Sequence, residues 1–294
     1  MSERRAIVAV LWGRQKGDRA VIPKGATLRV GRTERADLVV PHDSKLSGVH
    51  FELHWDGERC HLRDLGSALG TALGGQRVEA GWVPHGGWVR AGETDFSVHV
   101  EAKTPPPAAD VYAPDFEIEA PGAEERRLRA LAALREALGE APLYAVVDAA
   151  RDGRILQLLR ESVDEYRSLY EGLAGEPFAH VAPYVVRLDP ESHLLESLVR
   201  EGWGRRWGFY ASCRTPLREL RRHLRRLLVV RNEETRARMY FRFYDPAVLR
   251  VFIEAATPLQ LSELFGELSE LYAEGPRGEL LRFVAPGATE EPGR

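Results

Sequence analysis

The stretch Leu46–Thr71 decides the fold of the first third of the chain, and it reads LSGVHFELHWDGERCHLRDLGSALGT. It contains two strand-length runs, Val49–Trp55 and Arg59–Asp64, that are rich in β-branched and aromatic residues. Asp56-Gly57 stands between the two runs, and Gly66 follows the second. Runs of this length with glycine between them are typical of β-strands joined by turns.

Runs of the same kind continue on both sides of this stretch, and glycines at positions 25, 74, 75, 86 and 87 separate several of them. This spacing predicts an all-β sandwich over residues 1–103. The other expected strands are Ile7–Leu11, Thr27–Val30, Asp37–Val40, Trp88–Ala91 and Thr94–Val100.

Four short motifs occur in order within the expected sandwich. They are Gly31-Arg32, Leu46–Phe51, Asp64–Ser67, and Gly70-Thr71 followed by Gly74-Gly75. In this order they resemble the forkhead-associated (FHA) family, whose members are β-sandwiches that read phosphothreonine. The resemblance implies that residues 1–103 are an FHA domain of the phosphopeptide-recognition type.

The resemblance also implies roles for individual residues. Arg32 and Ser47 would grip the phosphate, and Lys45 would lie near the bound peptide. A phosphothreonine carries close to two negative charges, which a guanidinium can meet bidentately while a serine hydroxyl adds a donor. The remaining matched positions would be framework residues, namely Gly31, His50, Asp64 and Gly70. Among them, His50 would brace the loops.

One segment departs from the family pattern. Where the family commonly reads Ser-Thr-Asn-Gly-Thr, this chain reads Ser67-Ala68-Leu69-Gly70-Thr71. Leu69 replaces the asparagine that clamps the peptide backbone, and a leucine side chain forms no hydrogen bond. Losing a couple of contacts of about 1 kcal/mol each weakens binding roughly tenfold or more. Two readings stay open: a site that still binds phosphothreonine, and a retained fold that no longer does.

Residues 104–125 differ in character from the sequence on either side. Three prolines follow Thr104, and six acidic residues without a basic one give the segment a charge of −6. Residues 1–103 carry +2 and residues 126–294 carry +1, so the whole chain has a net charge of −3. Proline favours extended backbone and like charges repel, so we expect an exposed acidic linker here. The near-neutral total gives the chain no attraction to nucleic acid or anionic membrane.

From residue 126 onward helical and strand-like periods alternate, which predicts an α/β (α+β) domain over residues 126–290. Asp245 followed by Pro246 predicts an N-cap and the first turn of a helix. Arg242, within the expected strand 238–244, is expected to be a buried structural partner of Asp148 or Asp245. The expected helices are 126–138, 153–170, 191–201, 216–228, 245–254 and 258–272. The expected strands are 143–148, 184–188, 207–212, 238–244 and 280–284.

Three parts of this half carry a second resemblance. They are Leu143–Arg151 (LYAVVDAAR), Tyr166–Gly172 (YRSLYEG) with Ala182–Val186 (APYVV), and Phe241–Leu249 (FRFYDPAVL). These stretches resemble the type VI secretion effector-chaperone (adaptor) family, catalogued as domain of unknown function 4123. Members of that family are thought to hold a toxic effector and deliver it to the VgrG spike protein, and they are not known as enzymes.

The expected helix 216–228 carries a dense set of arginines. Its leucines form one stripe, and Glu219 is the only acid among the surrounding arginines. Like charges three and four residues apart destabilise a helix slightly, so an acidic partner surface would be favourable. A solvated helix face, paired with acids elsewhere in the fold, is the equally open alternative. The candidate partner-binding residues are Arg218, Arg221, Arg222 and Arg225.

The sequence shows no recognisable catalytic or metal-binding motif. His50 and His54 would lie about 13 Å apart along a strand, too far to share one metal. Cys213 with His223 is a weak signal for a nucleophile, since a buried thiol is the commoner explanation. We therefore expect no enzyme activity, no metal and no cofactor. Cys60 and Cys213 lie far apart in the sequence, which fits a reducing cytoplasm.

Together these features predict a cytoplasmic two-domain adaptor. Its C-terminal domain would bind a secreted effector protein and the VgrG spike, and its FHA domain would dock or regulate that step through a phosphothreonine-containing protein. The alternative is a phosphothreonine-dependent signalling scaffold without chaperone activity. A hydrolase would need a convergent polar pocket in the second domain. Nucleic-acid binding is not expected, because the net charge of the chain is only −3. Membrane insertion is not expected, because no apolar stretch approaches the length that spans a bilayer.

Overall fold

The computed structural model describes residues 3–11, 15, 17–107, 122–170, 179–231 and 237–286. The chain divides into two compact units. The first comprises Met1–Pro105 with Arg160–Val163, and the second comprises Pro106–Leu159 with Asp164–Arg294. Within the described ranges, no helix has both the length and the apolar character needed to cross a bilayer.

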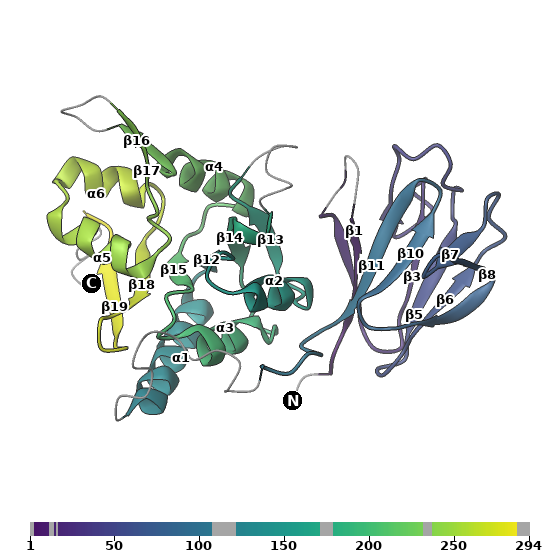
Figure 1. Cartoon of the computed structure of the whole chain (residues 1–294), viewed down its shortest axis with the longest axis horizontal. Helices are drawn as coiled ribbons and strands as arrows, with labels where there is room; N and C mark the ends of the chain where they lie inside the picture. The colour runs from purple at the N-terminus through teal and green to yellow at the C-terminus, as the bar shows by residue number, and fades with distance from the viewer. Residues whose placement is uncertain are drawn as a thin grey trace, which may run out of the picture. The chain divides into compact units, whose positions relative to one another are not determined.

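The first unit consists of two β-sheets (Figure 1). Its strands are β1 (Ala6–Val10), β2 (Arg19–Ile22), β3 (Thr27–Gly31), β4 (Leu38–Val39), β5 (Phe51–Trp55), β6 (Cys60–Asp64), β7 (Thr71–Leu73), β8 (Gln76–Val78), β9 (Ala80–Val83), β10 (Gly87–Ala91) and β11 (Thr94–Val100). One sheet has the order β2-β1-β11-β10-β7-β8 and the other the order β4-β3-β5-β6-β9. The pair β3–β4 is parallel, whereas β5 pairs antiparallel with both of its neighbours.

Alternating side chains from both sheets fill one hydrophobic core. In β5, Phe51, Leu53 and Trp55 are buried, while the residues between them are partly exposed. Phe96 of β11, in the opposite sheet, packs edge-on against Phe51 with ring centroids 5.5 Å apart. The all-β sandwich expected for this part of the chain is confirmed.

Four short strands, β2, β7, β8 and β9, were not expected from the sequence. Strands β7 and β8 form a hairpin around Gly74 and Gly75, whose φ angles are 57° and 84°. Such positive φ values are readily adopted only by glycine. With three or four residues each, these strands are too short to show the alternating period that identifies a strand in a sequence.

The described residues of the second unit form one six-stranded sheet and six α-helices, with helices on both sides of the sheet (Figure 1). The helices are α1 (Ala123–Glu140), α2 (Gly153–Arg160), α3 (Leu194–Gly202), α4 (Leu217–Leu227), α5 (Pro246–Ala255) and α6 (Pro258–Phe265), with a short 3₁₀ helix at Ala179–Val181. The strands are β12 (Leu143–Asp148), β13 (Glu165–Ser168), β14 (Pro183–Arg187), β15 (Gly208–Ser212), β18 (Glu270–Glu274) and β19 (Leu280–Val284), and β16 (Val229–Arg231) with β17 (Arg238–Tyr240) forms a separate hairpin. The sheet has the order β13-β14-β12-β15-β18-β19, and its neighbouring strands are antiparallel.

Helices cover both faces of this sheet, so the unit has two hydrophobic cores. Side chains of α1, α2 and α3 share one core with Ala145 and Val147 of β12. Side chains of α4, α5 and α6 share the other core with Tyr144 and Val146 of the same strand. All six residues of β12 are buried, which explains why this strand reads as a continuous apolar run. The α/β (α+β) class expected for this half is confirmed.

Two expected helices were too long. The helix expected at 153–170 ends at Arg160, and β13 follows it and pairs with β14. The chain leaves the helix near the buried Asp164, whose carboxylate accepts hydrogen bonds from the backbone N–H of Asp189 (2.7 Å) and the hydroxyl of Ser192. The helix expected at 258–272 ends at Phe265, because Gly266 takes a φ of 53°.

The strand expected at 238–244 was also too long, since β17 ends at Tyr240 and the following residues turn into α5. Asp245 caps that helix as predicted: its carboxylate accepts a hydrogen bond from the N–H of Ala247 (3.0 Å). Residues 108–121, most of the expected linker, lie outside the described residues. So do Glu171 and Gly172 of the second motif group.

Candidate phosphate pocket and a polar network in the second unit

Arg32 and Ser47 lie side by side on the loops that follow β3 and precede β5. The backbone N–H of Arg32 donates to the carbonyl of Ser47 (2.9 Å), and Nε of Arg32 donates to the carbonyl of Leu46 (3.2 Å). The Arg32 side chain is exposed, and it has no carboxylate partner among the residues that the structure describes. A guanidinium held in place but left without a counter-charge is suited to a dianion such as phosphate.

Gly31 allows the two loops to come this close. A Cβ at Gly31 would collide with the carbonyl oxygen of Gly48, the residue after Ser47. Thr33 adds a further link, because its hydroxyl donates to the same carbonyl (2.9 Å). The framework role expected for Gly31 thus has a steric basis.

His50 connects the Ser47 loop with the loop between β6 and β7. It is fully buried, and its Nδ1 accepts a hydrogen bond from the backbone N–H of Ser47 (3.0 Å). Its Nε2 lies 3.2 Å from the carbonyl oxygen of Gly70. With Nδ1 as the acceptor, the ring proton resides on Nε2 and is donated to Gly70. His50 therefore links both loops through hydrogen bonds.

Asp64 organises the loop that His50 reaches. Its carboxylate accepts hydrogen bonds from the backbone N–H and the hydroxyl of Ser67 (2.8 and 2.6 Å) and from the hydroxyl of Thr71 (2.6 Å). Burial opposes ionisation, but these hydrogen bonds prevail and hold the pKa of Asp64 below its ordinary value. The carboxylate is thus ionised at neutral pH and fixes the loop from Ser67 to Thr71.

Lys45 does not point freely at the pocket, because its Nζ forms an ion pair with Glu93 (2.8 Å). Asp43 holds the same loop from beneath: its carboxylate accepts hydrogen bonds from the N–H groups of Lys45 and Glu93 and from the hydroxyl of Thr94. Sequence reasoning missed Asp43, although an aspartate that accepts a hydrogen bond from the backbone N–H two residues later, here Lys45, is typical of turns. A bound peptide would recruit Lys45 only by displacing Glu93.

The residues that depart from the family pattern lie on the loop that contacts Ser47. The backbone N–H of Ala68 donates to the Ser47 hydroxyl oxygen (3.1 Å). Leu69 follows, and its side chain is 55% exposed. An aliphatic side chain with this exposure is not part of the core, so it is accessible to whatever occupies the pocket.

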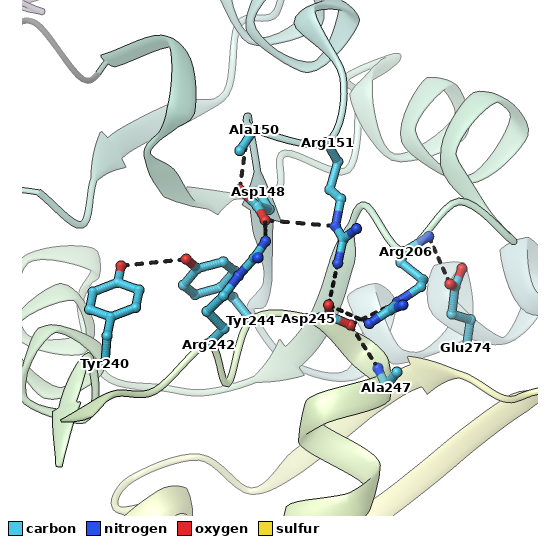
Figure 2. A network of polar contacts seen from close by, with 10 residues as sticks. All are labelled: Asp148, Ala150, Arg151, Arg206, Tyr240, Arg242, Tyr244, Asp245, Ala247 and Glu274. Atoms are coloured by element: carbon cyan, nitrogen blue, oxygen red, sulfur yellow. Dashed lines mark hydrogen bonds and ion pairs between the residues drawn. The ribbon is translucent and has the colours of Figure 1, made fainter. Parts of the chain in front are cut away.

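In the second unit, the first and third motif stretches, Leu143–Arg151 and Phe241–Leu249, meet in one polar network (Figure 2). Two buried carboxylates form its centre, Asp148 at the end of β12 and Asp245 at the start of α5. Arg242 donates to Asp148 (2.7 Å), one of the two partners expected from the sequence. Its side chain is 46% exposed, so the expectation that it is buried was wrong. Arg151 bridges the two centres, with a hydrogen bond to Asp245 and an ion pair to Asp148 (3.8 Å).

Arg206 completes this arginine–carboxylate network from the loop before β15. Its guanidinium meets Asp245 in a bidentate pair, with Nε to Oδ1 at 3.0 Å and Nη2 to Oδ2 at 2.5 Å. Burial opposes ionisation of Asp245, but the hydrogen bonds, chiefly from Arg206, hold its pKa below the ordinary value. Arg206 has a φ of 57°, a left-handed conformation that costs energy for any residue but glycine.

Glu274 fixes this strained loop. Its buried carboxylate accepts hydrogen bonds from the backbone N–H groups of Gly204 (2.6 Å) and Arg206 (2.8 Å). Burial raises the pKa of Glu274 to about 7, although these hydrogen bonds and nearby arginines act in the opposite direction. Sequence reasoning missed Glu274 and Arg206, because neither lies in a motif and their contact joins residues 68 positions apart.

Tyrosines border the exposed side of the network (Figure 2). The guanidinium of Arg242 lies over the ring of Tyr244, 5.8 Å from its centroid. The hydroxyl of Tyr240 is 2.9 Å from that of Tyr170 and 3.4 Å from that of Tyr244. Tyr240 is 48% exposed, so a tyrosine and an arginine stand together at this surface, a combination that is enriched in protein interfaces.

The structure separates the arginines of α4 into two groups. Arg221 donates to the carbonyls of Ser168 and Tyr170, and Arg225 donates to the carbonyl of Leu169 (3.0 Å). These two bind the helix to the end of β13. Arg218, Arg222 and Arg226 are exposed, four residues apart on one side of the helix, and have no ion-pair partner in the described part of the chain. We call these three the α4 arginine row.

The described residues contain no group of three or more His, Cys, Asp or Glu side chains placed to hold a metal ion. Cys60 and Cys213 are both buried free thiols. Burial raises the pKa of the Cys60 thiol to about 12, which leaves it protonated and unreactive at neutral pH.

Comparisons with known proteins match each unit separately. The family model described as "FHA domain" matches residues 28–91, and the one described as "Domain of unknown function (DUF4123)" matches residues 143–263. No curated protein matches the chain significantly.

Several solved FHA structures are similar to the first part of the chain. One, from an analysis of phosphothreonine-dependent FHA domain interactions, is 24% identical over 35% of this chain and 99% of that chain, with a TM-score of 0.30. The FHA domain of the CT664 protein from Chlamydia trachomatis is 24% identical over 32% of this chain and 96% of that chain, with a TM-score of 0.31. EmbR from Mycobacterium tuberculosis, in complex with a low affinity phosphopeptide, is 20% identical over 35% of this chain and 26% of that chain, with a TM-score of 0.30. On the strength of the two family matches, the chain joins an FHA domain to a domain of the DUF4123 family, as the two sequence resemblances predicted.

Proposed function

We propose that this protein is a two-domain adaptor of type VI secretion that acts in the donor cytoplasm. The DUF4123 domain binds a cognate toxic effector and helps to load it onto the VgrG spike. The FHA domain binds a phosphothreonine-containing protein and thereby docks or regulates the complex. The match to DUF4123, a family associated with effector adaptors, supports the first part.

One observation carries the FHA half of the proposal: the unpaired guanidinium of Arg32 beside Ser47. The phosphate would accept hydrogen bonds from this guanidinium and from the Ser47 hydroxyl. The loops are already braced by His50 and Asp64, so little ordering entropy opposes binding. The pocket thus has the charge and the rigidity that recognition of a phosphate requires.

In the DUF4123 domain, recognition would proceed through surfaces, without bond chemistry. The α4 arginine row offers three positive charges about one helical turn apart, which complement an acidic segment of a partner. Arg221 and Arg225 are proposed to hold α4 in position, because they donate hydrogen bonds to the backbone carbonyls of Ser168 and Leu169. The domain is proposed to have no enzymatic activity.

The FHA half is tested with the full chain and a degenerate phosphothreonine peptide library. We expect the wild type to retain phosphorylated peptides over their unphosphorylated counterparts. Arg32→Ala should lose at least tenfold in affinity, because charge-assisted hydrogen bonds contribute about 1.5–3 kcal/mol. Equal retention of both peptide forms would refute the proposal for this domain.

The adaptor half is tested by purification of the full chain from the source cells, with bound proteins identified by mass spectrometry. We expect a toxin-like effector and VgrG, retained by Arg32→Ala and lost when the α4 arginine row is changed to glutamate. The matched control changes three other exposed arginines to glutamate: Arg187, Arg200 and Arg277.

A phosphothreonine-dependent scaffold is the second candidate function, and the intact Arg32–Ser47 pair favours it. It predicts the opposite pattern. Partners would then disappear with Arg32→Ala, and neither an effector nor VgrG would be among them.

A further inference from the structure

A second unpaired arginine lies at the wall of the phosphate pocket. Arg77 of β8 is exposed, and no ion pair joins it to another residue within the described ranges. Its side chain reaches back over Gly70: a Cβ placed on Gly70 would lie 2.5 Å from Nε of Arg77 and 2.7 Å from Nη2. Gly70 has a φ of 76° and no side chain, so the guanidinium rests directly on its backbone.

Gly70 belongs to the loop that forms one side of the pocket. Its carbonyl accepts the hydrogen bond from His50, which also holds Ser47. Two residues earlier, the N–H of Ala68 donates to the Ser47 hydroxyl. The guanidinium of Arg77 therefore stands next to Leu69, on the loop that contacts the phosphate-binding serine.

We propose that Arg77 replaces the missing asparagine of this FHA domain by donating hydrogen bonds to the backbone carbonyls of the bound phosphopeptide. This inference rests on the proposed phosphothreonine binding. The exposed Leu69 then provides apolar contact where the asparagine would have stood. Arg77 acts as a specificity-determining residue for the peptide, separate from Arg32, which meets the phosphate.

The chemistry of the two side chains gives this replacement a measurable signature. An asparagine side chain both donates and accepts hydrogen bonds, whereas a guanidinium only donates and carries a full charge. A clamp made by Arg77 should therefore depend on the ionic strength, because an exposed charge is screened by salt. A clamp made by asparagine should depend on it less.

The test uses the full chain and one fluorescein-labelled phosphothreonine peptide, selected from the degenerate library with the wild type. Fluorescence anisotropy gives the Kd at 50 and 300 mM salt. We expect Arg77→Ala to weaken binding roughly tenfold or more, since one or two charge-assisted hydrogen bonds are lost. The double variant Arg77→Ala with Leu69→Asn should regain most of that affinity and show a smaller salt dependence than the wild type.

The matched control is Arg90→Ala. Arg90 and Arg77 flank the same residue of β7, Ala72, on its two neighbouring strands. Arg90 is likewise exposed and forms a long ion pair with Asp95 (3.8 Å). The Arg90→Ala variant should bind the peptide with the affinity of the wild type. Melting temperatures of all variants show whether a loss of binding comes from unfolding, and rescue by Leu69→Asn would exclude that explanation directly.

Each outcome bears on the inference. Wild-type affinity of Arg77→Ala, with phosphopeptide binding intact, would overturn the role of Arg77 and leave the proposed FHA function standing. Loss of binding that Leu69→Asn does not restore would also count against it. A wild type that binds no phosphothreonine peptide would overturn both the inference and the proposed function. Binding gained only with Leu69→Asn would identify the missing asparagine as the cause.

Discussion

The buried carboxylate of Glu274 makes the stability of the second unit dependent on pH, and Glu274→Gln tests this. Burial raises the pKa of Glu274 to about 7 from an ordinary value of 4.5. The folded state therefore binds the proton more tightly than the unfolded state, and the unfolding free energy falls as the pH rises from about 4.5 through 7. At 1.36 kcal/mol per pH unit, the difference corresponds to roughly 3 kcal/mol above pH 7.

Glutamine cannot ionise, although its amide oxygen replaces only one of the two acceptors that the carboxylate offers to Gly204 and Arg206. We expect the stability of Glu274→Gln to fall less than that of the wild type between pH 5 and 8, by up to roughly 3 kcal/mol. The assay is urea unfolding of the full chain at pH 5, 6, 7 and 8, followed by tryptophan fluorescence, because Trp203 and Trp207 lie in this unit next to Glu274.

Other groups also titrate in this range, and the comparison of variant with wild type removes their contribution. Burial raises the pKa of Asp164 to about 6, which gives a fall in stability of the same sign. Burial lowers the pKa of His99 to about 4, which gives a rise in stability between pH 4 and 6.5. If the wild type and Glu274→Gln lose stability equally between pH 5 and 8, the reasoning about Glu274 is refuted.

Three further predictions concern stability and phosphopeptide binding. Asp245→Ala should lower the unfolding free energy by about 2–4 kcal/mol, because the half-buried Arg206 loses its carboxylate partner and α5 loses its N-cap, and a melting temperature that drops by less than 3 °C would contradict this. Gly31→Ala should abolish phosphopeptide binding, since its Cβ collides with the carbonyl of Gly48, and unchanged binding in the anisotropy assay would argue against that contact. Arg221→Ala should destabilise the fold by about 1–3 kcal/mol in urea unfolding, whereas Arg222→Ala should stay within about 0.5 kcal/mol; equal effects would show that the division of the α4 arginines is wrong.

The sequence predicted the parts of the fold that depend on long local patterns. Strands such as β5 and β11 have five and seven residues, which is long enough for apolar and polar residues to alternate recognisably in the sequence. The helix expected at 153–170 failed beyond Arg160, because a buried carboxylate at Asp164 and pairing with β14 override local helix propensity. Such tertiary contacts are not visible in a single sequence.

The same limit applies to the two sites. The proximity of Arg32 and Ser47 was predictable because an ordered set of motifs surrounds them, and Asp148 was one of two partners expected for Arg242. The position of Arg77 over Gly70 was not predictable, because a hairpin of three-residue strands defines it. The strained loop at Arg206 depends on a carboxylate far along the chain, which no local pattern reveals.

Strand β12 contributes alternate side chains to both cores of the second unit, with Tyr144 on one side and Ala145 on the other. The two helical layers therefore pack against the same strand, and neither layer can unfold without exposing β12 side chains that the unit otherwise buries. We expect the unit to unfold in a single cooperative step rather than layer by layer. A partner that binds any one helix, α4 included, would thereby stabilise the whole unit against unfolding.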